Sequence, residues 1–166
     1  MKYQSTRNDR LTATSTEAVL QGLAPDGGLY IRSSLEGFDC KGVLAPDTLG
    51  MAERILGFLL PDFEHMGELV HRAYDGKFET PDLTPLVPVG ENYVLELFRG
   101  PTSAFKDVAL SMLPQLITAA RRQEGVTQDI VILTATSGDT GKAALEGFRD
   151  VEGTRILVFY PADGVS

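Results

Sequence analysis

The chain has 166 residues, of which 43% are hydrophobic, and a formal net charge of −8 at pH 7. This length and composition suit one ordinary domain, or a small domain joined to part of a larger one, and argue against wholesale disorder. The acidic balance argues against nonspecific binding to nucleic acid or to anionic membranes. Cys40 is the only cysteine, so an intrachain disulfide is impossible and a zinc site, which needs clustered ligands, is not expected.

No apolar run approaches the roughly 20 residues that span a membrane. The first residues, Met1–Arg7, are polar and lack the apolar segment of a secretory signal. We therefore expect no membrane association, and a reducing, cytoplasmic setting fits the single cysteine.

The N-terminal part predicts short elements. Tyr3–Arg7 has the pattern of an opening edge strand, and Leu29–Ile31 that of another short strand. Thr14 and Glu17 have capping-box spacing, which predicts a short helix over residues 15–22. Residues 33–42 have the composition of a loop.

Two helices are predicted next. Apolar residues recur at helical spacing over Thr48–Leu60 and again from Phe63 to Ala73, and Gly76 is a suitable stop for the second helix. Residues 79–88 contain three prolines, which favours an extended connector. We therefore predict a domain boundary here, with a small, mainly helical domain over residues 1–80 and a second domain over residues 81–166.

In the second domain, strand and helix patterns alternate. Strands are predicted over residues 93–98, 130–134 and 155–160, with helices over residues 102–124 and 140–148. Pro114 predicts a kink or break of the first helix near Leu113. Strands separated by helices imply parallel pairing with right-handed crossovers, hence an α/β fold, and the nearly all-apolar strand at 130–134 predicts cover on both faces. About three strands make a small parallel sheet, so we expect this domain to be incomplete and the chain to be an N-terminal piece of a longer protein.

The first strand-to-helix loop carries a lysine, Lys106, which we place in the first turn of the helix predicted to start near Thr102. A cation is unfavourable at the electropositive end of a helix, which suits an amine that must react as a nucleophile or base. The alternative is a surface lysine whose stem lies on Phe105 or another neighbour.

The second loop, Thr136–Gly141, combines two glycines and three hydroxyls at the start of a helix. Such a loop suits a carboxylate or a phosphate. The alternative is a purely structural loop in which Asp139 caps the helix. The spacing is neither that of a Walker A loop nor that of the dinucleotide fingerprint.

Other candidate sites are weaker. Arg7, in the first strand, could lie near a phosphate, or could belong to a solvated terminal strand. His65 and His71 are six residues apart, which does not stack them on one helical face.

Several motifs together resemble threonine synthase, a fold-type II pyridoxal-phosphate family. The resemblance covers essentially the whole chain in family order and is carried by Leu95–Asp107, Ala135–Gly141, Tyr3–Arg7 and Gly22–Tyr30. Two positions depart from the usual pattern: Arg99 stands where a histidine is common, and Ser103 where a bulkier residue is common.

This resemblance implies a lyase of threonine biosynthesis that converts O-phospho-L-homoserine and water to L-threonine and phosphate, with pyridoxal 5′-phosphate as electron sink. Lys106 would hold the cofactor as a Schiff base and carry protons at Cα and Cβ. The substrate carboxylate, or the cofactor's edge, would be held by Thr136, Ser137, Gly138, Asp139 and Thr140. Arg7 would lie near the substrate phosphate. In this family the loop that grips the cofactor phosphate lies well downstream of the lysine, so the 166 residues alone are expected to be inactive.

Two alternatives stay open at this point. One is a related pyridoxal-phosphate phospholyase that acts on another phosphorylated amino acid. The other is a truncated, non-catalytic paralogue that binds a carboxylated ligand through Thr136–Gly141. The sequence predicts neither an oligomeric state nor an effector.

Overall fold

The computed structural model describes residues 2–163, so Met1 and residues 164–166 of the two predicted domains lie outside it. By internal contacts the chain divides into two compact units. Unit 1 contains residues 1–70 and 116–127, and unit 2 contains residues 71–115 and 128–166. The predicted division at residue 80 stays a prediction, because the units are defined by contacts rather than by independent folding.

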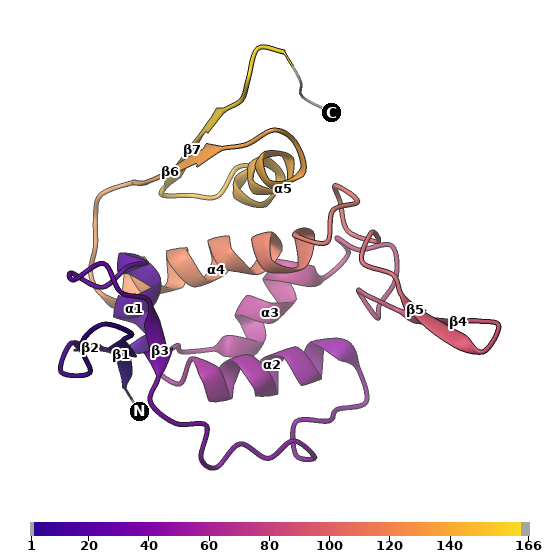
Figure 1. The fold of residues 1–166 in the computed structure, drawn as a ribbon, viewed down its shortest axis with the longest axis horizontal. Coiled ribbons are helices and arrows are strands. Elements are labelled where there is room, and N and C mark those ends of the chain that lie inside the picture. Colours follow the sequence, from indigo (N-terminus) through magenta and orange to yellow (C-terminus); the bar gives the residue numbers. More distant parts are fainter. Residues whose placement is uncertain (1, 164–166) are drawn as a thin grey trace. The chain divides into compact units, whose positions relative to one another are not determined.

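Unit 1 opens with a small antiparallel sheet of order β2-β1-β3 (Figure 1). Its strands are β1 (Tyr3–Ser5), β2 (Thr12–Ala13) and β3 (Tyr30–Arg32). The predicted capping box is confirmed: the Thr14 hydroxyl accepts from the Glu17 amide at 3.1 Å, and the Glu17 carboxylate accepts from the Thr14 amide at 2.8 Å. These bonds satisfy orphan donors at the start of α1 (Ser15–Gln21), and Gly22 ends it with φ 68°.

Two further helices, α2 (Thr48–Leu59) and α3 (Met66–Tyr74), follow. Asp47 caps α2 by accepting from the Gly50 amide at 2.7 Å. Helix α3 begins three residues later than predicted, because His65 has a left-handed φ of 54° that interrupts the helical path. Asp62, between the helices, accepts from both the amide and the hydroxyl of Ser15, which anchors α1 within unit 1.

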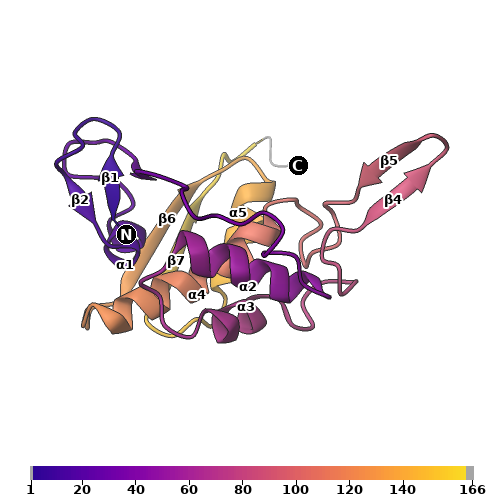
Figure 2. The same cartoon turned by 90° about the horizontal axis from the view of Figure 1, so that it is seen from below.

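Unit 2 contains a hairpin that the sequence did not predict. Strands β4 (Leu86–Val89) and β5 (Asn92–Leu95) pair antiparallel, and Gly90, with φ 61°, forms their tight turn. The prediction that the segment at 93–98 joins the parallel sheet is therefore wrong (Figures 1 and 2). The prolines of residues 79–88 indicated an extended connector, but Pro88 is compatible with strand β4 because edge strands tolerate proline.

Helix α4 (Asp107–Gln123) passes through Pro114 without the predicted break. Proline lacks the amide that would bond to the Leu110 carbonyl four residues earlier. That carbonyl instead lies against Gly147, where an added Cβ would be 2.1 Å from the oxygen. Pro114 itself is fully buried, so packing within unit 2 compensates for the missing helical bond.

The parallel pair consists of β6 (Ile130–Ala135) and β7 (Thr154–Phe159), joined through α5 (Asp139–Phe148). One face of the pair packs on α5. Among the described residues, the other face is uncovered, and its exposed side chains include Val131, Leu133, Leu157 and Phe159. The predicted α/β class with parallel pairing is confirmed. The strand at 130–134 was predicted to be covered on both faces, but among the described residues only the face toward α5 is covered.

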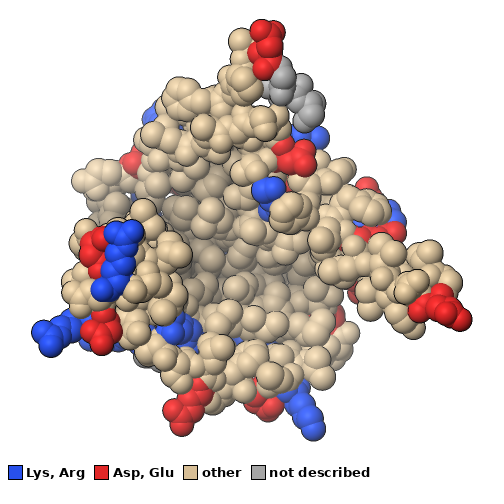
Figure 3. Space-filling view, in the orientation of Figure 1, with Lys and Arg blue, Asp and Glu red and all other residues tan. Residues whose placement is uncertain are grey.

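Within residues 2–163, no helix is both long enough and apolar enough to cross a membrane. On the face shown in Figure 3, acidic and basic side chains are interspersed and form no large patch of one sign.

Candidate active site

The loop that carries Lys106 is held from inside by one carboxylate. Asp107 is 2% exposed, and its two oxygens accept from the Thr102 amide at 2.8 Å and the Thr102 hydroxyl at 2.6 Å. An added Cβ at Gly100 would lie 2.5 Å from the Asp107 side chain, so a glycine is needed for this close approach. The carboxylate therefore fixes the loop against the first turn of α4.

Lys106 lies immediately before α4 and not inside its first turn. Ser103 has a left-handed φ of 59°, so the helix cannot start near Thr102 as predicted. A turn closed by the Asp107 amide and the Ala104 carbonyl at 3.0 Å follows. The first bond of helical spacing runs from the Leu110 amide to the Lys106 carbonyl at 2.8 Å, so Lys106 occupies the capping position.

The amine of Lys106 lies 4.1 Å from the centre of the Phe105 ring, and the side chain is half-buried. Among the residues that the structure describes, no carboxylate lies within ion-pair distance of this amine. The contact with Phe105 matches the surface-lysine alternative, yet it leaves the amine without an anionic partner.

The approach to this loop is fixed by an arginine. The Arg99 guanidinium contacts the Glu79 carboxylate at 2.8 Å and the Glu96 carboxylate at 2.7 Å. Two hydrogen bonds raise the pKa of Arg99 above its usual value. The bond to the Glu79 carboxylate has the larger effect and the bond to the Glu96 carboxylate the smaller one. The Arg99 carbonyl also accepts from the Glu79 amide at 2.9 Å, so the connector and the start of the lysine loop are joined.

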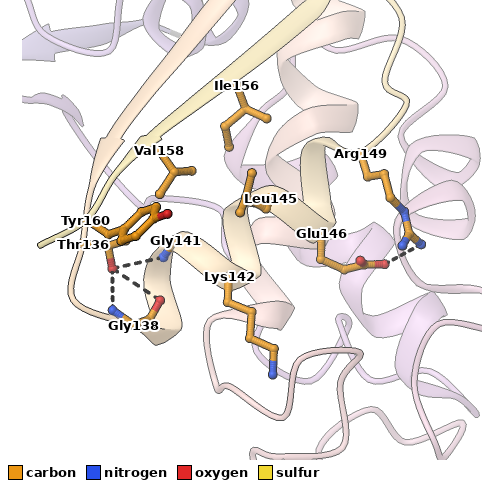
Figure 4. Close-up of a pocket in the computed structure, with 10 residues that line it drawn as sticks. All are labelled: Thr136, Gly138, Gly141, Lys142, Leu145, Glu146, Arg149, Ile156, Val158 and Tyr160. Carbon is orange, nitrogen blue, oxygen red and sulfur yellow. Dashed lines mark hydrogen bonds and ion pairs between the residues drawn. The ribbon is translucent and has the colours of Figure 1, made fainter. Parts of the chain in front are cut away.

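The second loop is organised by Thr136 (Figure 4). Its hydroxyl accepts from the amides of Gly138 and Gly141 at 3.1 and 3.2 Å. An added Cβ at Gly141 would lie 2.1 Å from the Thr136 methyl group, so this glycine serves close packing inside the loop. Neither loop glycine has a φ in the left-handed region, and no capping bond from the Asp139 carboxylate is found in the described part of the chain.

The N-terminus of α5 keeps donors available. The Lys142 amide bonds to the Gly138 carbonyl at 3.2 Å, as the first full helical bond. The amides of Asp139 and Thr140 have no hydrogen-bond acceptor among the described residues, and the side chains of Ser137 and Thr140 are exposed. Two amides at a positive helix end, with hydroxyls beside them, can bind a carboxylate or a phosphate.

A cavity of about 570 Å³ opens beside this loop, between α5 and β7 (Figure 4). Its wall is mainly apolar and includes Leu145, Ile156 and Val158. Lys106 does not line it, so the cavity is not the pocket of the amine.

A hydrogen bond joins the lysine loop to the first turn of α5. The Lys142 ammonium donates to the Thr102 carbonyl at 3.3 Å. The structure therefore links the lysine loop to the start of α5 inside unit 2, whereas Arg7 belongs to unit 1. There its guanidinium donates to the Asp26 carbonyl at 3.0 Å.

No cluster of His, Cys, Asp and Glu side chains that could hold a metal ion is found in residues 2–163. Sequence reasoning missed the two residues that hold the lysine loop. Asp107 follows Lys106 directly, and its acidic side chain at a helix start was a usable signal. Lys142 carried no signal, because its partner is a backbone carbonyl 40 residues away.

The family model described as threonine synthase N terminus matches residues 2–53. The threonine synthase of Saccharomyces cerevisiae is 36% identical over 99% of this chain, and that of Pseudomonas aeruginosa is 35% identical over all of it. By sequence and by fold, the chain matches the N-terminal portion of threonine synthases.

The structural comparison agrees with the sequence comparison. The crystal structure of pyridoxal-phosphate-bound threonine synthase from Brucella melitensis superimposes with a TM-score of 0.89 at 35% identity. It covers 100% of this chain, and the chain covers 37% of that structure. The chain likewise spans 36% of the yeast and Pseudomonas threonine synthases. The resemblance inferred from the motifs is confirmed for this portion.

Proposed function

We propose that this chain supplies the lysine loop and the substrate-binding loop of a threonine synthase. The reaction converts O-phospho-L-homoserine and water to L-threonine and phosphate, with pyridoxal 5′-phosphate as cofactor. The observation that carries the proposal is an amine without an anionic partner, on a loop joined directly to a helix end with two available amides.

The residues present fit the cofactor at the point where it would be attached. An aldehyde condenses with a neutral amine, and a neighbouring carboxylate would favour the charged ammonium instead. Within the described residues no carboxylate forms an ion pair with Lys106. When bound, pyridoxal phosphate stabilises negative charge at the substrate carbon atoms. Lys106 would hold it and would move protons at Cα and Cβ of the substrate.

The start of α5 would orient the substrate. The amides of Asp139 and Thr140, with the hydroxyls of Ser137 and Thr140, would bind the substrate carboxylate or the edge of the cofactor. Thr136 and Gly138 would act through the loop conformation, since the Thr136 hydroxyl is used by the loop's own amides. Arg7 is proposed near the substrate phosphate, because a guanidinium matches phosphate geometry.

A cytoplasmic location is proposed for the parent protein. The single cysteine of these 166 residues supports it.

The proposal is tested with Lys106→Ala in the full-length protein. We expect that variant to fold and to release neither phosphate nor threonine from O-phospho-L-homoserine, because the amine that holds the cofactor is gone. Lys41→Ala, which removes an exposed lysine of unit 1, is the matched control and should keep full activity. Activity retained by Lys106→Ala would contradict the proposal.

A substrate panel separates threonine synthase from a related phospholyase. Phosphate release and threonine formation are measured separately for each phosphorylated amino acid. Equal amounts of phosphate and threonine from O-phospho-L-homoserine support the proposal. Phosphate release from another phosphorylated amino acid, without threonine, would replace it with the phospholyase alternative.

A further inference from the structure

Thr102 is a junction between the two loops of unit 2. It is 8% exposed, and its amide and hydroxyl both donate to Asp107. Its carbonyl accepts from the Lys142 ammonium at 3.3 Å. All its hydrogen-bonding groups are therefore used, two within the lysine loop and one by α5.

We propose that Lys142 is a positioning residue that sets the lysine loop, and so Lys106, relative to the N-terminus of α5. Lys142 forms one hydrogen bond through its backbone amide and one through its side-chain ammonium. Its amide bonds to the Gly138 carbonyl as part of the α5 start, and its ammonium bonds to the lysine loop. One residue thus connects the proposed carboxylate-binding amides to the loop that carries the reactive amine. The inference rests on the proposed function and adds a residue to it.

The local charges leave Lys142 available for this role. Its helical neighbour at i+4, Glu146, is paired with Arg149 at 2.8 Å. Figure 4 shows the Glu146 carboxylate joined to Arg149, with no ion pair drawn to Lys142. A lysine in the first turn is unfavourable with respect to the helix dipole, and a bond to a carbonyl outside the helix offsets this.

A displacement at Thr102 would reach Lys106 because the intervening loop is short and internally bonded. The Ser103 amide bonds to the Gly100 carbonyl at 3.1 Å, and the Asp107 amide to the Ala104 carbonyl at 3.0 Å. The loop therefore moves as a unit, and misplacement of a reacting group by about 1 Å can slow a reaction by up to about 100-fold.

The first experiment compares three variants of the full-length protein. Lys142→Met keeps the length of the stem and removes the donor, Lys142→Arg restores a cationic donor, and Arg155→Met is the control. Arg155 is an exposed cation of unit 2 that pairs with Asp129 at 3.0 Å. It lies at the end of the strand pair away from the Thr136–Gly141 loop.

We expect Lys142→Met to lower kcat about tenfold with a smaller change in KM, because it disturbs orientation more than binding. Lys142→Arg should restore kcat to within about threefold, and Arg155→Met should match the parent protein. Unchanged kcat and pH profile in Lys142→Met would overturn the proposal. So would equal losses in the Met and Arg variants together with a lower melting temperature, since that pattern indicates a packing role.

The second readout needs no activity. Amide hydrogen exchange in the cofactor-free protein reports how firmly the loop is held. Lys142→Met should speed exchange at the Thr102 and Ser103 amides about tenfold while leaving the melting temperature within about 2 °C. Unchanged exchange would overturn the positioning role. A parent protein with no turnover would instead contradict the proposed function, and the exchange result would still decide the role of Lys142.

Discussion

The two strand-to-helix loops of unit 2 are built in opposite ways. The lysine loop uses its backbone and hydroxyl donors internally, through the buried carboxylate of Asp107, and presents a side chain, Lys106. The second loop uses one hydroxyl, that of Thr136, and presents backbone amides of α5. A charged residue therefore organises the first loop and a neutral residue the second.

The proposed function accounts for this difference. A reactive amine requires a loop whose other polar groups are already satisfied, because competing donors and acceptors would change its geometry. An anion site on a helix end requires the reverse, with amides left available. The hydrogen bond from the Lys142 ammonium to the Thr102 carbonyl connects the lysine loop to the helix that follows the second loop.

The largest effect on stability is expected from Asp107→Ala. The variant leaves two buried donors of Thr102 without their acceptor, so it should lower the free energy of unfolding by about 2–4 kcal/mol. Urea unfolding of the full-length protein measures this.

The matched control is Asp139→Ala. Asp107 and Asp139 are each the first residue of the helix that follows their loop, but Asp139 is exposed. Its loss should lower the free energy of unfolding by less than about 1 kcal/mol, through the helix dipole alone. Equal losses in the two variants would mean that the loops are not held in different ways.

An intermediate effect is expected from Gly141→Ala. The added methyl group would lie 2.1 Å from the Thr136 methyl group, so the variant should lower the free energy of unfolding by about 1–3 kcal/mol. Thr136→Ser removes that methyl group and keeps the hydroxyl. The double variant should therefore recover most of the loss, and a double variant no more stable than Gly141→Ala would contradict this account of the second loop.

A smaller effect is expected from Tyr74→Phe. The Tyr74 hydroxyl donates to the Val108 carbonyl in the first turn of α4 at 2.8 Å, so its loss should lower the free energy of unfolding by about 1 kcal/mol at neutral pH. Tyr93→Phe, at an exposed tyrosine of β5, is the control and should change little.

The same variant has a pH signature. Burial raises the pKa of Tyr74 from 10.0 to about 12. Because the folded state favours the neutral phenol, this contribution is fully present below pH 10 and is lost as the pH rises from 10 toward 12. Urea unfolding between about pH 9 and 12 should therefore show a flatter pH dependence in Tyr74→Phe than in the parent, and identical slopes would contradict the assignment.

Local sequence signals predicted much of the fold. The Thr14–Glu17 box, the α5 segment and the stop at Gly76 after α3 were predicted correctly because each depends on neighbours within a few residues. The α/β class followed from alternating strand and helix patterns. The β4–β5 hairpin was missed because its prolines resembled a connector.

The site was predicted less completely, because its geometry depends on distant partners. The role of Lys106 stays a prediction, and its place before α4 depends on the left-handed φ of Ser103, which no residue pattern indicated. The continuity of α4 through Pro114 depends on packing within unit 2. The role proposed for Lys142 depends on a contact between two loops, which periodicity and capping rules do not report.

The most direct test of the account is to trap the amine. The full-length protein is loaded with pyridoxal phosphate and reduced with borohydride, and its peptides are mapped by mass. We predict a single pyridoxyl-phosphate adduct on Lys106 and none on Lys142, because only the first lysine is presented by its loop as an amine without a protein acceptor or an anionic partner among the described residues. An adduct on Lys142, or no adduct in a folded protein, would contradict the central claim that the first loop exists to present Lys106.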